Sequence, residues 1–293
     1  MDIRRYLEEK KAVVDAQIDK VLPRATEGIY AAMRYSLFAG GKRLRSILAI
    51  AATEAVGSSP KDILSVASAL EFIHTYSLVH DDLPAMDNSD FRRGKPTSHK
   101  MFGDATAILT GDALLTMAFE LMTTPESTKG LDPRVLQQVV CEVARAAGTE
   151  GMIGGQVADL DYAGRKPSAQ ELEYIHQHKT AALIRTSAWT GAVLGNSSPG
   201  QVEAIRGYGE KVGLAFQIVD DILDEVGEEG RLGKTPGGDR EMEKATYPAL
   251  FGIEDSKRRA KILIGSAVGE LKEFDERADA LRGIAEFIVA RDF

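Results

Sequence analysis

The chain has 293 residues, enough for one large domain or two small ones, and 44% hydrophobic and 27% charged residues exclude a disordered or fibrous protein. Its net charge of −8 argues against nucleic acid as the main partner, because a phosphate backbone requires a basic binding face. Cys141 is the single cysteine, which excludes an internal disulfide and is typical of a reducing compartment.

No segment approaches the roughly 18 uninterrupted apolar residues that a membrane span requires. The N-terminal residues 1–20 are charged throughout and lack the apolar stretch of a signal peptide. We therefore expect a cytoplasmic protein that makes no stable membrane insertion.

Helical periodicity runs through the whole chain. Apolar residues recur at three- and four-residue spacing in segments such as 62–80, 133–148 and 201–223. No run of alternating β-branched residues between turn signals predicts a β-hairpin. Glycine and proline breaks divide the chain into about ten or more helices. In chain order they fall at 57–60, 84, 94–96, 124–133, 164–167, 195–200 and 227–238. None of the breaks is a linker, so we expect one all-α domain over residues 1–293.

An acidic cluster follows the apolar helix predicted over residues 62–80. Asp81 and Asp82 come at the end of this helix, and Asp87 follows after Pro84. Because proline ends or bends a helix, we expect Asp87 to turn back toward Asp81.

A second acidic cluster lies within the helix predicted over residues 201–223. Asp220 and Asp224 are four residues apart and share one helical face, with Asp221 adjacent. Oxygen ligands of this kind suit Mg²⁺, which commonly joins carboxylates to substrate phosphates. A solvated acidic face explains either cluster alone, but the same pattern after two apolar helices favours a metal site.

Several cations lie near the two clusters in the sequence. They are Lys42, Arg45, Arg92, Arg93, Lys179 and Lys234. Arginine forks match phosphate oxygens in pairs, and lysine supplies a point charge. The nucleotide-binding patterns GxGxxG and GxxxxGK[ST] are both absent, so the sequence favours a diphosphate bound directly.

The chain resembles the trans-isoprenyl diphosphate synthase family over almost its whole length. The motifs that carry the resemblance are GGKRLR, EFIH, HDDLPAMDN with RRGKPT, GDALLTMAFEL, GMIGGQVADL, HKTAALI, FQIVDDILD, GKTPGGD and KATYPAL. The resemblance implies the isoprenoid synthase fold, an all-α bundle around a deep central cavity, usually as a homodimer. Ser46 departs from the family pattern, because proline often follows GGKRLR.

The resemblance also implies a role for each matching residue. Three Mg²⁺ ions would join Asp81, Asp87, Asp220 and Asp224 to an allylic diphosphate, with Asp82 as a weaker or supporting ligand. The allylic diphosphate would be held by Arg92, Lys179, Thr180, Gln217 and Lys234. Isopentenyl diphosphate would be held without metal by Lys42, Arg45, His74 and Arg93. The catalytic set would be Asp81, Asp87, Lys179, Thr180, Gln217 and Lys234.

The implied reaction is ionisation of the allylic diphosphate, condensation with isopentenyl diphosphate and loss of a proton to the released pyrophosphate. Tyr76 precedes Asp81 by five residues, about 7.5 Å along the helix axis at about 1.5 Å per residue. An aromatic residue there resembles the bacterial farnesyl diphosphate synthases and predicts a C15 product. The alternative is the C20 geranylgeranyl diphosphate, with Tyr76 an ordinary core residue and a neighbouring helix as the floor.

Two other functions compete with this interpretation. A class I terpene cyclase would convert one prenyl diphosphate without isopentenyl diphosphate, and the retained isopentenyl-binding residues argue against it. A non-catalytic subunit that regulates a partner typically loses one aspartate motif, whereas both are intact here.

Overall fold

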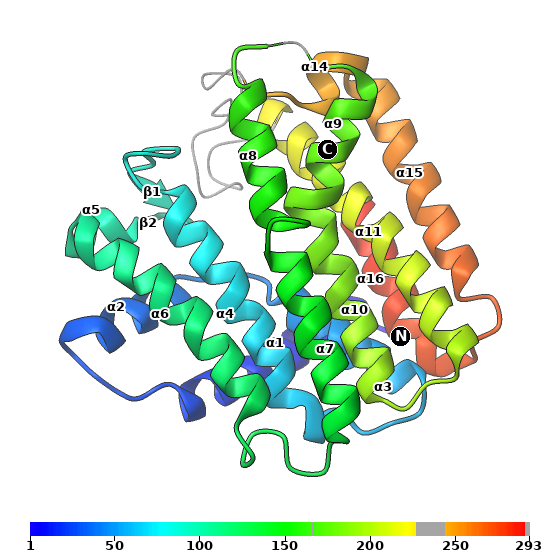
Figure 1. The fold of residues 1–293 in the computed structure, drawn as a ribbon. Coiled ribbons are helices and arrows are strands. Elements are labelled where there is room, and N and C mark those ends of the chain that lie inside the picture. The colour runs from blue at the N-terminus through cyan, green and yellow to red at the C-terminus, as the bar shows by residue number, and fades with distance from the viewer. Residues whose placement is uncertain (166, 227–243, 291–293) are drawn as a thin grey trace.

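The computed structural model describes residues 1–165, 167–226 and 244–290 of the 293-residue chain. Most of these residues lie in helices, which confirms the predicted all-α class (Figure 1). The first α-helices are α1 (Ile3–Val21), α2 (Gly28–Leu37), α3 (Leu44–Ala55), α4 (Leu64–Asp81), α5 (Ser98–Phe102), α6 (Asp104–Thr123) and α7 (Pro133–Ala147). The later ones are α8 (Met152–Tyr162), α9 (Ala169–His176), α10 (Ala182–Leu194), α11 (Pro199–Val226), α14 (Tyr247–Phe251), α15 (Ile253–Glu270) and α16 (Asp279–Val289). Short helices are the 3₁₀ turns η1 (Pro60–Ile63) and η3 (Glu276–Ala278) and the π turn η2 (Gln177–Ala181).

Local sequence signals explain where several helices begin. Asp132 caps α7 by accepting the Arg134 N–H, and Pro133 occupies the first helical position, where no N–H is needed. Ser168 and Glu171 form a capping box at the start of α9. These ends are therefore determined by residues within one turn of the helix.

The predicted breaks up to residue 200 separate helices or turns, and the break at 227–238 lies outside the described residues. Further breaks were not among those predicted, and they include Gly103, residues 148–151 and Gly252. Gly103 and Gly252 have φ angles of 83° and 77°, and each ends one helix and caps the next. Glycine adopts this left-handed backbone at little cost, so a single residue suffices to redirect the chain.

The expectation of no hairpin was wrong in one place. Strands β1 (Phe91–Arg92) and β2 (Lys95–Pro96) pair antiparallel across a two-residue turn. Arg93 and Gly94 both have positive φ, 55° and 73°, as a type I′ turn requires. Strands of two residues are too short to produce an alternating pattern in the sequence.

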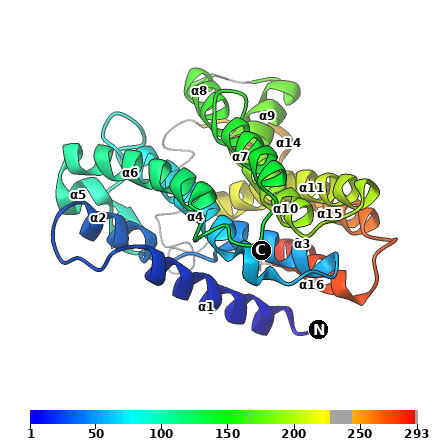
Figure 2. The same cartoon turned by 60° about the horizontal axis from the view of Figure 1, so that its bottom comes forward.

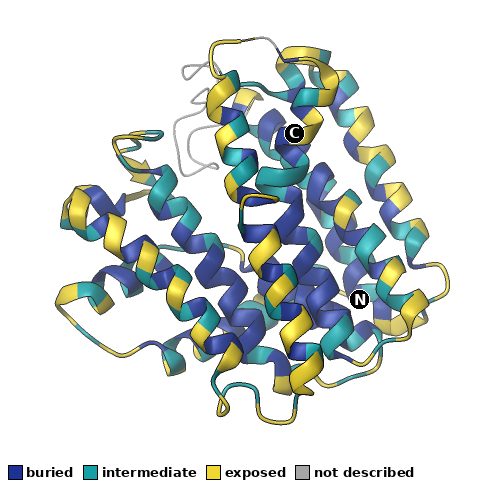
Figure 3. Cartoon of the chain, viewed as in Figure 1, coloured by how far each residue is buried: buried dark blue, intermediate teal, exposed yellow. Residues whose placement is uncertain are grey.

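Two hydrophobic clusters form the core. The first contains buried residues of α1, α2, α4, α6 and α7, and the second contains those of α11, α15 and α16. Helices α3 and α10 contribute to both clusters. In Figure 2, α1 runs beneath the other helices, and its buried residues Val14 and Ile18 belong to the first cluster. Figure 3 shows the buried faces of the central helices and the exposed faces of the outer ones.

The small residues of α10 allow α3 to approach closely. A Cβ at Gly191 would lie 1.9 Å from the Ala49 carbonyl oxygen, and Thr53 donates a 2.8 Å hydrogen bond to the Gly191 carbonyl. The small residues of α10 are thus a packing feature.

Among the described residues, α6 is the one helix long and apolar enough to cross a membrane by length and composition. A core helix passes the same test. Ala107, Leu114 and Ala118 of α6 are fully buried in the first cluster, and α6 packs along α4.

Candidate active site

The first acidic cluster is bent, as the sequence predicts. Asp81 is the last residue of α4, and the Asp87 N–H donates a 2.9 Å hydrogen bond to the Asp81 carbonyl. Burial raises the pKa of the Asp81 carboxyl, Lys179 opposes the shift and Asp87 adds to it. Two desolvated carboxylates at the end of one helix therefore require cations around them.

Asp82 has a different role from its neighbour. Arg92 donates from Nε to both Asp82 carboxylate oxygens, at 2.8 and 2.9 Å, and its second guanidinium nitrogen lies 2.7 Å from Oδ1. Asp82 is 3% exposed, whereas the Arg92 side chain is partly exposed, so the pair is buried on its carboxylate side. Asp82 thereby orients Arg92 from β1 toward the end of α4.

The second acidic cluster occupies the C-terminal part of α11, where Asp220 and Asp224 are one turn apart. The adjacent Asp221 carboxylate accepts hydrogen bonds from α11 and from the start of α14. It accepts a 2.7 Å hydrogen bond from Gln217 Nε2 and a 2.9 Å hydrogen bond from the Tyr247 N–H. Asp221 therefore connects α11 to the start of α14.

The segment 244–247 links the two clusters. Lys244 Nζ lies 2.9 Å from Asp87 Oδ2, and three residues later the Tyr247 N–H reaches Asp221. Three peptide steps span at most about 11 Å between Cα atoms, so both clusters lie close to the same short segment. The structure thus brings together two motifs that are far apart in the sequence.

The predicted diphosphate residues Lys179 and Thr180 lie in the π turn η2, between α9 and α10. Lys179 Nζ is 2.6 Å from Asp159 Oδ2, and Thr180 donates a 2.6 Å hydrogen bond to Gln217 Oε1. Burial by itself lowers the pKa of Lys179. The carboxylates of Asp159 and Asp81 have the larger combined effect, and the net result is a pKa above the ordinary value for lysine. Lys179 is therefore a stable cation at the first acidic cluster. Single π turns occur frequently at functional sites.

Gly155 and Gly213 allow two helices to close on this π turn. A Cβ at Gly155 of α8 would lie 2.2 Å from the Lys179 backbone nitrogen. A Cβ at Gly213 of α11 would lie 2.7 Å from the Ala181 Cα. The position of the π turn thus depends on the absence of these two side chains.

The predicted isopentenyl-binding residues come from four separate places in the fold. Lys42 is in the loop before α3, Arg45 is on α3, His74 is on α4, and Arg93 is in the hairpin turn. Burial, with Arg45 and Arg93 nearby, holds the pKa of His74 well below its ordinary value. Burial lowers the pKa of Arg45 to about 10, and the Glu71 carboxylate opposes the shift. His74 is thus a neutral side chain among arginines.

Arg93 also contacts the glycine loop directly. Its guanidinium donates to the Gly40 carbonyl, and a Cβ at Gly41 would lie 2.5 Å from the same guanidinium nitrogen. Gly40 and Gly41 have φ angles of 117° and 119°, which only glycine adopts readily. The backbone conformation therefore requires glycine at both positions. At Gly41 a side chain would also collide with the Arg93 guanidinium.

Tyr76 is 6% exposed and belongs to the first hydrophobic cluster. Its ring meets the His80 ring edge-on, with centroids 5.7 Å apart. Burial raises the pKa of Tyr76 to about 12, so the hydroxyl stays protonated. The role of Tyr76 as the floor of a substrate cavity stays a prediction.

A cavity of about 710 Å³ adjoins the second acidic cluster. Asp221, Asp224 and Lys244 line it together with residues of α14. Lys234 lies outside the described residues, so its predicted role stays a prediction. Within the part of the chain that the structure describes, no three His, Cys, Asp or Glu side chains form a ready metal cage.

Sequence reasoning missed two charged residues of the site. Lys244 belongs to the KATYPAL motif, and Asp159 belongs to GMIGGQVADL. Both motifs signal the family, but only the contacts of Lys244 with Asp87 and of Asp159 with Lys179 indicate their roles.

His176 provides a test of the electrostatics beside the site. It is 4% exposed, its Nε2 lies 3.5 Å from Asp221 Oδ2, and its ring faces Tyr247. Burial lowers the pKa of His176 to about 3. Above pH 6.5 the residue is neutral in both the folded and unfolded states, whereas below it only the unfolded state gains the proton. The contribution of neutral His176 to the free energy of unfolding is therefore lost as the pH falls from 6.5 toward 3.

Below pH 6, we expect protonation of His176 in the unfolded state to lower the free energy of unfolding by about 1 kcal/mol per pH unit. The His176→Gln variant should lose a smaller part of its stability than the wild type between pH 7 and 5. Urea unfolding followed by circular dichroism at several pH values measures the difference. Equal pH dependence of the two proteins would contradict the assignment.

Comparison with known proteins supports the same interpretation. The polyprenyl synthetase family model matches residues 26–283. The chain is 44% identical over 295 residues to a farnesyl diphosphate synthase of Geobacillus stearothermophilus, covering 100% of this chain and 99% of that one. It is also 44% identical over 289 residues to a geranylgeranyl diphosphate synthase of Cyanophora paradoxa, covering 98% and 96% of the two chains.

Solved structures agree with these relatives. An FPP/GFPP synthase from Zymomonas mobilis has a TM-score of 0.86 at 36% identity, with 99% of each chain covered. A geranylgeranyl pyrophosphate synthetase from Pyrococcus horikoshii has a TM-score of 0.88 at 30% identity, again with 99% of each chain covered. The helical architecture is thus the isoprenoid synthase fold, and the chain belongs to the polyprenyl synthetase family.

Proposed function

We propose that this trans-prenyltransferase condenses dimethylallyl and geranyl diphosphate with isopentenyl diphosphate to form farnesyl diphosphate. The observation that carries the proposal is the meeting of both aspartate clusters at the segment 244–247, with Lys179 and Arg92 beside the first cluster. An anionic substrate joined through cations to two facing acidic groups requires this arrangement.

Mg²⁺ is the proposed cofactor, as the oxygen-only ligand set favours. Asp81 and Asp87 fit the ion, because the bend after Pro84 brings them together and Lys244 already places a cation 2.9 Å from Asp87. Asp220 and Asp224 would supply the second ligand group. When bound, the ions would neutralise the diphosphate and stabilise its negative charge as it leaves. The number of three ions rests on the family resemblance.

The protein's own residues account for the rest of the proposed chemistry. Lys179 and Arg92 would stabilise the departing diphosphate, since both have pKa values raised above their ordinary values, by Asp159 and by Asp82 respectively, despite burial. Gln217, held by Asp221, would orient the Thr180 hydroxyl next to the diphosphate. Exclusion of water would protect the allylic cation from hydrolysis. The released pyrophosphate would accept the final proton.

The C15 product is part of the proposal, with C20 as the alternative. Farnesyl and geranylgeranyl diphosphate synthases are equally similar relatives, so overall identity does not separate the two products. Tyr76 favours C15, because a buried aromatic ring one and a half turns below Asp81 would block a longer chain.

Replacing Tyr76 with alanine should shift the main product from C15 to C20 or longer. The variant removes the ring and opens space beneath the aspartates. Chromatographic sizing of dephosphorylated products measures the shift, and Tyr76→Phe, which keeps the ring, should still stop at C15. A Tyr76→Ala enzyme with unchanged product length would assign the floor to another residue.

The remaining parts of the proposal concern assembly and location. We propose a cytoplasmic, single-domain homodimer that binds no nucleic acid and has no stable membrane insertion. Ile108 and Leu109 of α6 are 46% and 58% exposed, and an apolar outer surface of this kind suits a second copy. The single domain is supported by α3 and α10, which belong to both hydrophobic clusters.

Incubation with each allylic diphosphate, isopentenyl diphosphate and Mg²⁺, followed by product sizing, tests the proposed function. We expect elongation from dimethylallyl and geranyl diphosphate and none after chelation of the metal. Lack of elongation from any primer would overturn the proposal and favour the non-catalytic subunit. Conversion of a prenyl diphosphate without isopentenyl diphosphate would indicate a cyclase.

A further inference from the structure

The loop before α3 carries an arginine that the proposed chemistry does not use. Arg43 lies between Lys42 and Arg45, both proposed to bind isopentenyl diphosphate, but its side chain is almost fully buried. It has a φ of 53°, a left-handed conformation that is unfavourable for a residue with a Cβ. It precedes the first residue of α3, and its side chain makes no capping hydrogen bond. Something other than local sequence must therefore hold this backbone.

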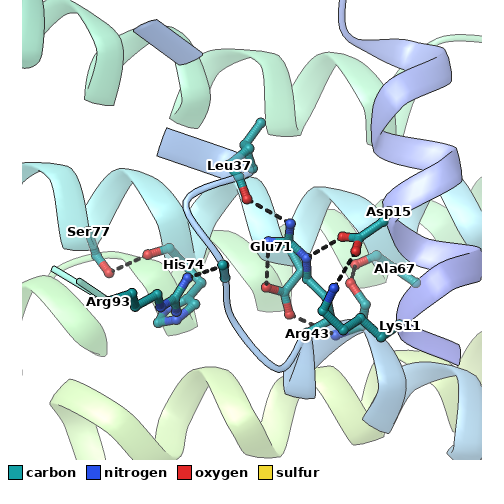
Figure 4. A network of polar contacts seen from close by, with 11 residues as sticks. Lys11, Asp15, Leu37, Arg43, Ala67, Glu71, His74, Ser77 and Arg93 are labelled. Atoms are coloured by element: carbon teal, nitrogen blue, oxygen red, sulfur yellow. Dashed lines mark hydrogen bonds and ion pairs between the residues drawn. The ribbon is translucent and has the colours of Figure 1, made fainter. Parts of the chain in front are cut away.

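The Arg43 guanidinium supplies the missing contacts, as Figure 4 shows. Its Nε donates a 2.7 Å hydrogen bond to Asp15 of α1, and a terminal nitrogen donates a 2.6 Å hydrogen bond to the Leu37 carbonyl at the end of α2. The other terminal nitrogen lies 3.9 Å from Glu71 of α4. One side chain thus connects three helices to the loop.

The acidic partners are themselves held in place. Lys11 pairs with Asp15 at 2.6 Å, one turn away on α1. Glu71 is 3% exposed and accepts a 3.3 Å hydrogen bond from the Ser46 N–H on α3. Glu71 is also the buried carboxylate that stabilises the charged forms of Arg45 and Arg93.

We propose that Arg43 is a positioning residue for isopentenyl diphosphate: buried between α1, α2 and α4, it holds the left-handed loop that presents Lys42 and Arg45. The loop is clamped on both sides, by Arg43 from the helices and by Arg93 through the Gly40 carbonyl. Arg93 is already assigned to the substrate, whereas Arg43 acts through its neighbours. This inference rests on the proposed function.

The chain offers a matched control for this role. Arg34 of α2 also pairs with an α1 carboxylate, Asp19, and donates to a backbone carbonyl, that of Leu22, at 3.2 Å. It connects α1 and α2 but does not contact the loop through these bonds. Its guanidinium also lies over the ring of Phe38, 5.1 Å from the centroid. Removing Arg34 therefore tests the loss of an interhelix tie and of this ring contact, while the Arg43 hydrogen bonds to Asp15 and to the Leu37 carbonyl stay in place.

The experiment measures the Kd of isopentenyl diphosphate without metal by calorimetry and the KM of both substrates, in wild type, Arg43→Met and Arg34→Met. Arg43→Met should raise the Kd and KM of isopentenyl diphosphate about tenfold or more, and change the allylic KM less than about twofold. Arg34→Met should lower the melting temperature and leave both KM values unchanged. Arg43→Lys should recover part of the loss, because it keeps the charge but not the fork.

Folded Arg43→Met protein that binds isopentenyl diphosphate like the wild type would overturn the inference, as would an equal rise in both KM values. If Arg43→Met does not fold, Asp15→Asn replaces it, with the same selective rise expected and its absence counting against the inference. Wild type that binds isopentenyl diphosphate but elongates no primer would overturn the proposed function instead, and the binding comparison would still test Arg43.

Discussion

Replacing Asp81 with asparagine should reduce elongation of geranyl diphosphate by at least about a thousandfold, while the protein stays folded. Asparagine keeps the shape of the side chain but removes the negative charge that would hold the proposed Mg²⁺. Asp87→Asn should have a similar effect, because the bend after Pro84 brings Asp87 to the same place. Steady-state rates at saturating substrate, measured over a range of Mg²⁺ concentrations, give the loss.

Asp90 provides the control for this prediction. It follows the same acidic stretch, but its side chain is 64% exposed and pairs with Lys100 on the surface. Asp90→Asn should therefore keep the activity within about twofold, since an exposed ion pair contributes little. Comparable losses in Asp81→Asn and Asp90→Asn would mean that general surface charge, rather than a metal site, explains the effect.

Replacing Gly155 with alanine should reduce kcat/KM for the allylic substrate by about a hundredfold. The new Cβ would lie 2.2 Å from the Lys179 backbone nitrogen, so the π turn that carries Lys179 and Thr180 must move. A displacement of about 1 Å at a catalytic group is sufficient for a loss of this size. The Kd of isopentenyl diphosphate should change little, because its proposed residues lie on other elements.

The same variant should also be less stable, by about 1–3 kcal/mol, because a packed helix contact gains a methyl group without space. Gly265→Ala is the matched control. No atom lies within 4 Å of a Cβ at Gly265, which is inside α15, so alanine should stabilise that helix by a few tenths to about 1 kcal/mol. Urea unfolding and the prenyl transfer assay together separate the two effects. Full activity in Gly155→Ala would show that the π turn tolerates displacement.

Local patterns in the sequence were sufficient for most of the helices and for the bend of the first acidic cluster. Apolar spacing predicted the helices, and Pro84 predicted the return of Asp87 to Asp81, because each depends on residues within one or two turns. The family motifs added the expected cations. Breaks made by single glycines, such as Gly103 and Gly252, were missed because a lone glycine is also compatible with a continuous helix.

The tertiary structure decided which neighbours have different roles. Asp81 and Asp82 are adjacent, as are Asp220 and Asp221, and nothing in their local pattern predicts which partners each side chain meets. Packing decides this for two of them: Arg92 donates to Asp82, and Gln217 Nε2 and the Tyr247 N–H donate to Asp221.

The largest gap between sequence and structure concerns contacts between distant residues. Lys244 pairs with Asp87 across 157 residues, and Arg43 reaches Asp15 across 28. Such pairs leave no periodic signal, because they depend on how whole helices pack against one another. The sequence by itself therefore determined the helices and the chemical groups, and only the tertiary structure decided which groups meet and which hold others in place.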